Sequence, residues 1–149
     1  MPEESLITDE MHSWLGKELD RQTLDVEKGA IRHFAEAIGD ENPLWSDAAA
    51  ARRSRYGGIT APPTFLRSAT PGLDFPFPTK PQRLLDGGSD WEYFEPIRAG
   101  DVITCVTLLA DIRERKGSLG PMLFLVRETT YTNQLGQIAA TQRSTQIRY

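Results

Sequence analysis

The spacing of the apolar residues changes midway along this 149-residue chain, and the change limits the folds that it can adopt. Up to residue 70 most apolar residues recur at helical spacing, and beyond residue 81 they alternate as in β-strands. Helices followed by antiparallel strands are typical of α+β proteins, in which helices gather on one face of a sheet. A long sheet wrapped around one apolar helix is one of several arrangements that fit. The pattern predicts helices over 5–15, 27–38, 48–54 and 63–70, an extended segment over 19–26, and strands over 90–95, 102–111, 122–132 and 137–148.

Residues that begin and end helices stand at the borders of these segments. Asp25 is suited to cap the helix over 27–38, and Gly39 to end it, because glycine readily adopts the left-handed backbone of a helix end. Asp47 can cap the alanine-rich helix that follows. Pro63 fits the first turn of the next helix, where its missing N–H would have no partner.

Turn-forming residues separate the expected strands. Lys116-Gly117-Ser118 and Asn133-Gln134-Leu135-Gly136 are suited to hairpin connections. Gly87-Gly88 is interpreted as a turn before a strand, and residues 71–81, which contain four prolines, as an irregular loop.

Size and charge narrow the class of protein. The length suits one domain, expected to span residues 1–149 with residues 1–20 as an N-terminal helical extension. A net charge of -4 argues against a nucleic-acid partner, because phosphate binding requires a basic face. The N-terminus is acidic, unlike a signal peptide, and no apolar run approaches the ~20 residues that span a bilayer. We therefore expect a cytoplasmic protein without membrane association.

Neither a metal nor a cofactor is expected. The chain has two well-separated histidines, His12 and His33, and a single cysteine, which gives no zinc-type ligand spacing. Cys105 lies in an apolar alternating stretch and is interpreted as a small buried strand residue. Gly87-Gly88 alone is too short for a phosphate-binding loop.

Three segments carry a family likeness: FAEAIGDENPLW over residues 34–45, SRYGGITAPPTF over 54–65, and DGGSDWEY with PIRAGD over 86–101. They resemble the MaoC-like hot-dog proteins, which include (R)-specific enoyl-CoA hydratases and 3-hydroxyacyl-thioester dehydratases. The second and third segments look most like the N-terminal MaoC-like dehydratase branch, also called fungal-fatty-acid-synthase-like dehydratase. The resemblance covers roughly Val26 to the C-terminus, and it implies a single hot-dog fold with an antiparallel sheet around a central helix.

The family's loop supplies an aspartate, an Asn-Pro turn and a histidine, which together add water to a 2-enoyl thioester. A carboxylate and an imidazole on either side of one water can activate the water and protonate the α-carbon. Asp40, Asn42 and Pro43 match the family residues, whereas Trp45 occupies the histidine position. Indole is a donor only and does not titrate near neutral pH. The resemblance therefore implies a degenerate site of Asp40, Asn42 and Trp45.

A second part of the family's machinery is also missing. Active members open the central helix with a His-Gly pair, whose glycine N–H is the expected donor to the enolate oxygen. The same spacing from Asp40 falls on Pro62 and Pro63, and proline has no N–H.

Simpler interpretations of these residues remain open. Asp40 also suits a turn after the helix, and both histidines suit surface or partly packed positions. Trp45 could plug the vacated cavity or cover an acyl chain.

A basic cluster at residues 52–55 precedes the glycine pair Gly57-Gly58. It could meet the phosphates of coenzyme A or of phosphopantetheine, or it could be a solvated helix end. The substrate-binding residues that the resemblance implies are Asp40, Trp45, Pro63, Arg55 and Gly88.

These features predict a subunit that supports catalysis without performing it. It would bind an acyl-CoA or acyl-carrier-protein thioester while a MaoC-like partner chain supplies the catalytic Asp and His. The pair would form a heterodimer or a dimer of heterodimers, because a single hot-dog sheet leaves an edge to cover. One alternative is a homodimeric hydratase with an altered site, built on Asp40 and a tyrosine such as Tyr56 or Tyr93. Another is a non-enzymatic acyl-thioester binding module.

Overall fold

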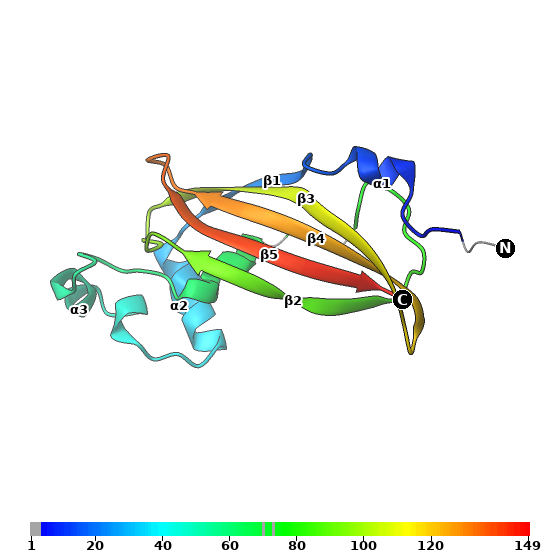
Figure 1. Ribbon diagram of the computed structural model, residues 1–149. Coiled ribbons are helices and arrows are strands. Elements are labelled where there is room, and N and C mark those ends of the chain that lie inside the picture. The colour runs from blue at the N-terminus through cyan, green and yellow to red at the C-terminus, as the bar shows by residue number, and fades with distance from the viewer. Residues whose placement is uncertain (1–3, 70, 73) are drawn as a thin grey trace.

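The computed structural model describes residues 4–69, 71–72 and 74–149. A five-stranded antiparallel sheet, in the order β1-β3-β4-β5-β2, forms the main layer, which confirms the expected α+β class. The helices α2 and α3 gather at one end of the sheet and α1 lies at the other (Figure 1). The elements are α1 (Asp9–Ser13), β1 (Glu18–Asp25), α2 (Lys28–Ala37), η1 (Pro43–Trp45), α3 (Ala48–Arg53), η2 (Pro63–Ala69), β2 (Leu84–Tyr93), β3 (Val102–Gly117), β4 (Gly120–Thr132) and β5 (Ile138–Arg148), where η denotes a 3-10 helix.

The inner face of the sheet is defined by the central strand β4. Leu123, Leu125 and Tyr131 share one phase of the strand and are fully buried, because alternate residues point to the same face. Tyr131 is paired with Cys105 on β3 and with Ala140 on β5, which are buried as well. The buried face therefore continues across the three central strands.

The helices α2 and η2 pack against this face. Ile31 and Ala35 are one helical turn apart and are the buried residues of α2. Phe34 of α2 meets Phe65 of η2 edge to face, with ring centroids 5.6 Å apart, a geometry worth roughly 0.5–1.5 kcal/mol beyond area burial. The buried residues of this cluster are Val26, Ile31, Ala51, Ile59, Ala61, Phe65, Leu66, Ala69, Ile97, Ile103, Cys105, Tyr131, Ala139 and Ala140.

A second apolar cluster lies under α1, at the other end of the sheet. Met11 is fully buried there together with Leu109, and Phe77 joins them from the loop before β2. The helix is shorter than the expected 5–15, because it begins after Thr8, whose Oγ1 accepts from the N–H of Met11 at 3.2 Å. Among the described residues, no helix is both long and apolar enough to cross a membrane.

The prediction that Asp25 caps α2 is wrong. Asp25 is the last residue of β1 and is paired with Val102, so its backbone belongs to the sheet. Glu27 takes the N-cap position instead, without a side-chain hydrogen bond. Gly39 ends the helix as expected.

The segment expected as a helix over 63–70 is a 3-10 helix. η2 spans Pro63–Ala69, and Thr70 lies outside the described residues. The N–H of Phe65 donates to Pro62 O at 2.9 Å, a bond between residues three apart that is typical of a 3-10 helix. Three of its side chains are nevertheless buried: Phe65, Leu66 and Ala69.

The strand expected over 90–95 begins six residues earlier, at Leu84. Gly87-Gly88 is not a turn before this strand but a bulge inside it, because the register with β5 shifts between Asp86 and Ser89. Gly88 has a φ of 100°, which favours glycine, and its N–H donates to Asp86 Oδ1 at 2.8 Å. The strands β3 and β4 are also longer than expected and meet across Ser118-Leu119.

The bulge yields a stability prediction. A Cβ on Gly87 would lie 2.9 Å from Thr145 Cγ2 and 3.0 Å from Thr145 O, so the backbone of β2 or β5 would have to move. We expect Gly87→Ala to lower the free energy of unfolding by about 1–3 kcal/mol in urea denaturation. Gly58→Ala is the matched control, because a Cβ on Gly58 meets nothing within 4 Å. Equal stability of the two variants would contradict the described bulge.

Candidate functional site

The loop that carries the degenerate family motif begins at the end of α2. Gly39 adopts a φ of 69°, and its N–H donates to Glu36 O at 3.1 Å. The N–H of Asp40 donates to Ala35 O at 2.9 Å. These two bonds form a Schellman motif, which fixes the direction in which the chain leaves the helix.

Side chains within the loop bind its own backbone. Asp40 Oδ1 accepts from the N–H of Asn42 at 3.0 Å, and Asn42 Oδ1 accepts from the N–H of Leu44 at 3.0 Å. Asp47 Oδ1 then accepts from Ala49 and Ala50 at 3.0 Å each, which confirms its expected role as the cap of α3. Asp40 is exposed and serves as a turn former in this structure, the simpler of its two interpretations.

Trp45 closes the motif and packs against the main core. Its indole lies beside the cluster under the sheet, and its Nε1 is buried without a hydrogen-bond partner in the described part of the chain. The backbone supports this position, because the N–H of Thr60 donates to Leu44 O at 3.2 Å. Trp45 and Pro63 line one hollow of about 200 Å³, together with Tyr56, Thr60, Ala61, Tyr93, Glu95, Pro96 and Ile97.

Asp40 lies in a different hollow. That hollow, about 410 Å³, is lined by Arg32, Ala35, Glu36, Gly39, Asp40, Glu41 and Ser46. Trp45 is not among its lining residues, and neither histidine is. His33 is 74% exposed and has Nδ1 3.8 Å from Glu36 Oε2, while His12 lies in α1 at the far end of the sheet (Figure 1). The hollow of Asp40 is therefore lined without an imidazole in the part of the chain that the structure describes.

The start of η2 offers little for an oxyanion. Pro62 is fully buried and Pro63 is the first residue of the 3-10 helix, and neither has an N–H. The first amide after this pair that the structure shows bonded, that of Phe65, donates to Pro62 O at 2.9 Å.

The two remaining expected binding residues lie apart from Asp40. Arg55 Nη2 donates to Tyr56 Oη at 2.6 Å, and its guanidinium lies over the Tyr56 ring at 4.8 Å from the centroid. Because Tyr56 lines the hollow of Trp45 and Pro63, Arg55 stands beside that hollow. Gly88 lies in the bulge of β2.

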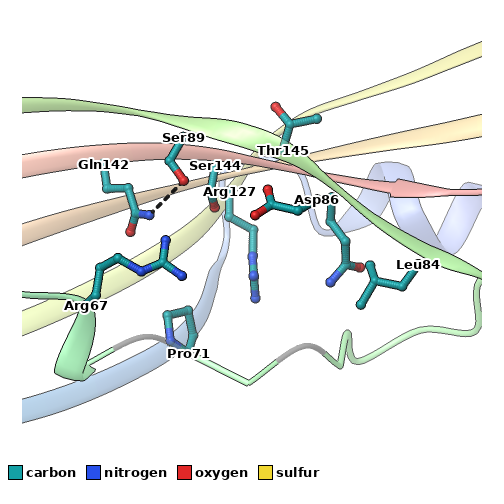
Figure 2. Close-up of a pocket in the computed structure, with 10 residues that line it drawn as sticks. Arg67, Pro71, Leu84, Asp86, Ser89, Arg127, Gln142, Ser144 and Thr145 are labelled. Atoms are coloured by element: carbon teal, nitrogen blue, oxygen red, sulfur yellow. Dashed lines mark hydrogen bonds between the residues drawn. The ribbon is translucent and has the colours of Figure 1, made fainter. Parts of the chain in front are cut away.

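The sequence interpretation missed a cavity under the sheet. It has a volume of about 130 Å³ and is formed by the inner faces of β2, β4 and β5 together with η2 (Figure 2). Arg127 projects into it from the middle of β4, between Leu125 and Thr129 in the inward phase. A charged residue at the inward phase of an otherwise apolar strand was the available signal. Its lining residues are Arg67, Pro71, Leu84, Asp86, Ser89, Arg127, Gln142, Ser144, Thr145 and Gln146.

Burial disfavours the ionised forms of Cys105 and of two tyrosines. Burial, with a smaller effect of Asp20, raises the pKa of the Cys105 thiol to about 11, so thiolate chemistry near neutral pH is suppressed. Burial also raises the pKa of Tyr131 and of Tyr93. The described residues contain no group of three or more His, Cys, Asp or Glu side chains that could hold a metal ion.

A long antiparallel sheet over buried helical segments, with an Asp-x-Asn-Pro loop beside it, defines a hot-dog domain of the dehydratase type. The chain belongs to the family described as FAS1-like, dehydratase domain region, whose model matches residues 13–142.

Relatives in sequence agree with this family. The chain is 36% identical over 118 residues to a UPF0336 protein of Thermobifida fusca, which covers 72% of this chain and 74% of that protein. It is 29% identical over 161 aligned positions to the probable enoyl-CoA hydratase alpha subunit of Thermomonospora curvata, which covers 93% of this chain and 50% of that protein.

Solved structures show the same fold. The MaoC-like dehydratase of Rhodospirillum rubrum superposes with a TM-score of 0.70 at 24% identity, over 91% of this chain and 92% of that one. A chain of the ChsH1-ChsH2 complex of Mycobacterium tuberculosis gives 0.72 at 20% identity, over 87% and 83%. A chain of the HadBC (3R-hydroxyacyl-ACP dehydratase) complex of the same organism gives 0.70 at 18%, over 90% and 96%. The expected hot-dog fold is thereby confirmed.

The position of Trp45 yields a second stability prediction. Trp45→Ala removes a partly buried indole from the core, so we expect a loss of about 2–3 kcal/mol in the free energy of unfolding, below the range for fully buried tryptophan. Asp40→Ala removes one exposed turn bond and should cost no more than about 1 kcal/mol. Urea denaturation of both variants measures this difference. If Trp45→Ala leaves the stability unchanged, the indole does not plug the core.

Proposed function

We propose that this chain is a non-catalytic subunit of an (R)-specific enoyl-thioester hydratase or 3-hydroxyacyl-thioester dehydratase. It completes the paired hot-dog architecture and helps to bind the acyl thioester. A MaoC-like partner chain supplies the catalytic aspartate and histidine.

The observation that carries the proposal is Trp45 at the position of the family's histidine. Hydration needs one group to take a proton from water and another to give a proton to the α-carbon. Indole can do neither near neutral pH, because its N–H is a donor that does not titrate there. Neither His12 nor His33 lines the hollow of Asp40, and the Oδ1 of Asp40 already accepts a backbone hydrogen bond.

The proline pair supports the same conclusion independently. Charge develops on the thioester oxygen during hydration, and a backbone N–H at the helix start normally stabilises it. Pro62 and Pro63 cannot donate there. Restoring a histidine alone would therefore leave the site incomplete.

Similar proteins support the need for a companion. One relative is named as the alpha subunit of a probable enoyl-CoA hydratase, and two structural neighbours, ChsH1-ChsH2 and HadBC, are complexes of two different chains. This chain resembles single members of such assemblies. The carrier of its thioester, coenzyme A or an acyl carrier protein, remains open to experiment.

The two alternatives receive less support. A homodimeric enzyme with an altered site would need Asp40 and a tyrosine to act on one substrate. Tyr56 and Tyr93 both line the hollow of Trp45, whereas Asp40 lines the other hollow. A non-enzymatic binding module is distinguished by the assay below, because it would bind thioesters without turnover even beside a competent partner.

The test is a reconstitution assay with crotonyl-CoA. We expect the purified chain alone to give no hydration, and a mixture with a MaoC-like chain encoded beside its gene, with both catalytic side chains intact, to give turnover. Asp40→Asn in this chain should leave that turnover within a factor of about two, because the amide oxygen can still accept from Asn42. Substantial turnover by the single chain, abolished by Asp40→Asn, would disprove the proposal.

A further inference from the structure

Most of the residues that line the cavity under the sheet carry polar groups beside their apolar carbon atoms. Of its ten lining residues only Pro71 and Leu84 are apolar, and the rest carry charged, amide or hydroxyl groups. Figure 2 shows Arg67 and Arg127 directed toward the same space, one from η2 and the other from β4.

Arg127 is the most unusual of these residues. It is only 8% exposed, and burial lowers the pKa of its guanidinium, with Asp20 raising it and Arg148 lowering it further. Its Nη1 donates to Gly72 O at 2.6 Å. Its Nε is buried without a hydrogen-bond partner in the described part of the chain.

The immediate neighbours of Arg127 compensate its charge only in part. The guanidinium lies 5.5 Å from the ring centroid of Phe75, in a cation–π contact that gives some stabilisation but no counter-charge. The lining places one carboxylate, Asp86, near Arg127, and Asp20 acts on this guanidinium from outside the lining. The Asp86 carboxylate is exposed and already accepts from Gly88 through Oδ1. A buried cation without a full counter-charge is costly, so the cavity favours an anion.

The opposite wall presents further hydrogen-bonding groups. Gln142 is 5% exposed, its Oε1 accepts from the Tyr131 hydroxyl at 3.1 Å, and its Nε2 donates to Ser89 Oγ at 3.3 Å. These bonds fix the amide with its N–H groups on the side of Ser89, which also lines the cavity. An oxygen ligand would therefore meet donors from two strands and from η2.

We propose that this cavity binds the carboxylate of a small organic acid, with Arg127 and Arg67 as its charged donors. A guanidinium presents paired N–H donors that match the two oxygens of a carboxylate. A cavity of ~150 Å³ holds benzene, so about 130 Å³ has room for roughly six non-hydrogen atoms. The carboxylate belongs either to a free acid or to the far end of an acyl thioester. Only the second source rests on the proposed function.

A carboxylate and its amide isostere test the site on the isolated chain. Butyrate and butyramide have the same size and differ in charge. In a titration followed by two-dimensional ¹H–¹⁵N NMR, we expect butyrate to shift the resonances of β4 and β5 residues around the cavity and to bind at least tenfold more tightly than butyramide.

Substitutions assign the donors. Arg127→Met keeps an unbranched apolar stem in the buried position but removes the guanidinium, and it should weaken butyrate binding about tenfold or more. Arg67→Gln changes the exposed donor on η2 and should weaken it as well, which keeps the test valid if Arg127→Met does not fold. Arg143→Gln is the matched control, because Arg143 lies on β5 next to Gln142 but pairs with Glu128 on the other face. It should leave butyrate binding unchanged.

Two thioesters identify the source of the carboxylate. Glutaryl-CoA and 5-methylhexanoyl-CoA have the same shape, with a carboxylate in the first where the second has an isopropyl group. Displacement of butyrate by glutaryl-CoA alone assigns the site to an acyl end, and displacement by neither assigns it to a free acid. Butyramide binding as tightly as butyrate, displacement by 5-methylhexanoyl-CoA, or an equal loss in Arg143→Gln would overturn the proposal. Because binding to the single chain is measured, its failure leaves the reconstitution result untouched, and the reverse also holds.

Discussion

The hydrogen bonds between side chains and backbone in the loop after α2 fix the path of the chain from this helix to α3. Asp40 binds Asn42, Asn42 binds Leu44, and Asp47 binds the first turn of α3, so each oxygen holds the next segment in place. In a catalytic relative the aspartate would have to face a water and an imidazole. Here its bonded oxygen stabilises a turn, and the indole that follows packs on the core. In the proposed subunit the same sequence motif therefore serves as a structural element in place of a proton relay.

The inner face of the sheet contains two regions of different composition. At one end Tyr131 and its neighbours form an apolar core with α2 and η2, which gives the fold its stability. Further along β4, Arg127 interrupts the apolar phase and lines the cavity under the sheet. A buried guanidinium costs stability unless it is compensated, so its presence argues for a binding role at that point. The proposed non-catalytic role and the proposed ligand site are compatible within one subunit.

Some of this structure could be predicted from the sequence and some could not. The change of apolar spacing gave the order of helices and strands, and Gly39 and Asp47 marked helix ends, because these signals are local. The prediction that Asp25 caps α2 was wrong, because the pairing of β1 with β3 determines where α2 begins. Gly87-Gly88 was interpreted as a turn because the sequence does not show the partner strand. A bulge can be recognised only from the register between two paired strands. The cavity was missed because its residues come from four elements, and only the register of β4 with β5 brings Arg127 opposite Ser144.

The most direct test of the central claim is the pH dependence of hydration by the reconstituted complex. The profile should be compared between the native chain and a variant carrying Asp40→Asn, His12→Gln and His33→Gln. If the partner chain supplies both catalytic groups, the two profiles will have the same limbs and maximal rates within a factor of about two. Loss of either limb in the variant would place a proton-transferring group in this chain and contradict the account.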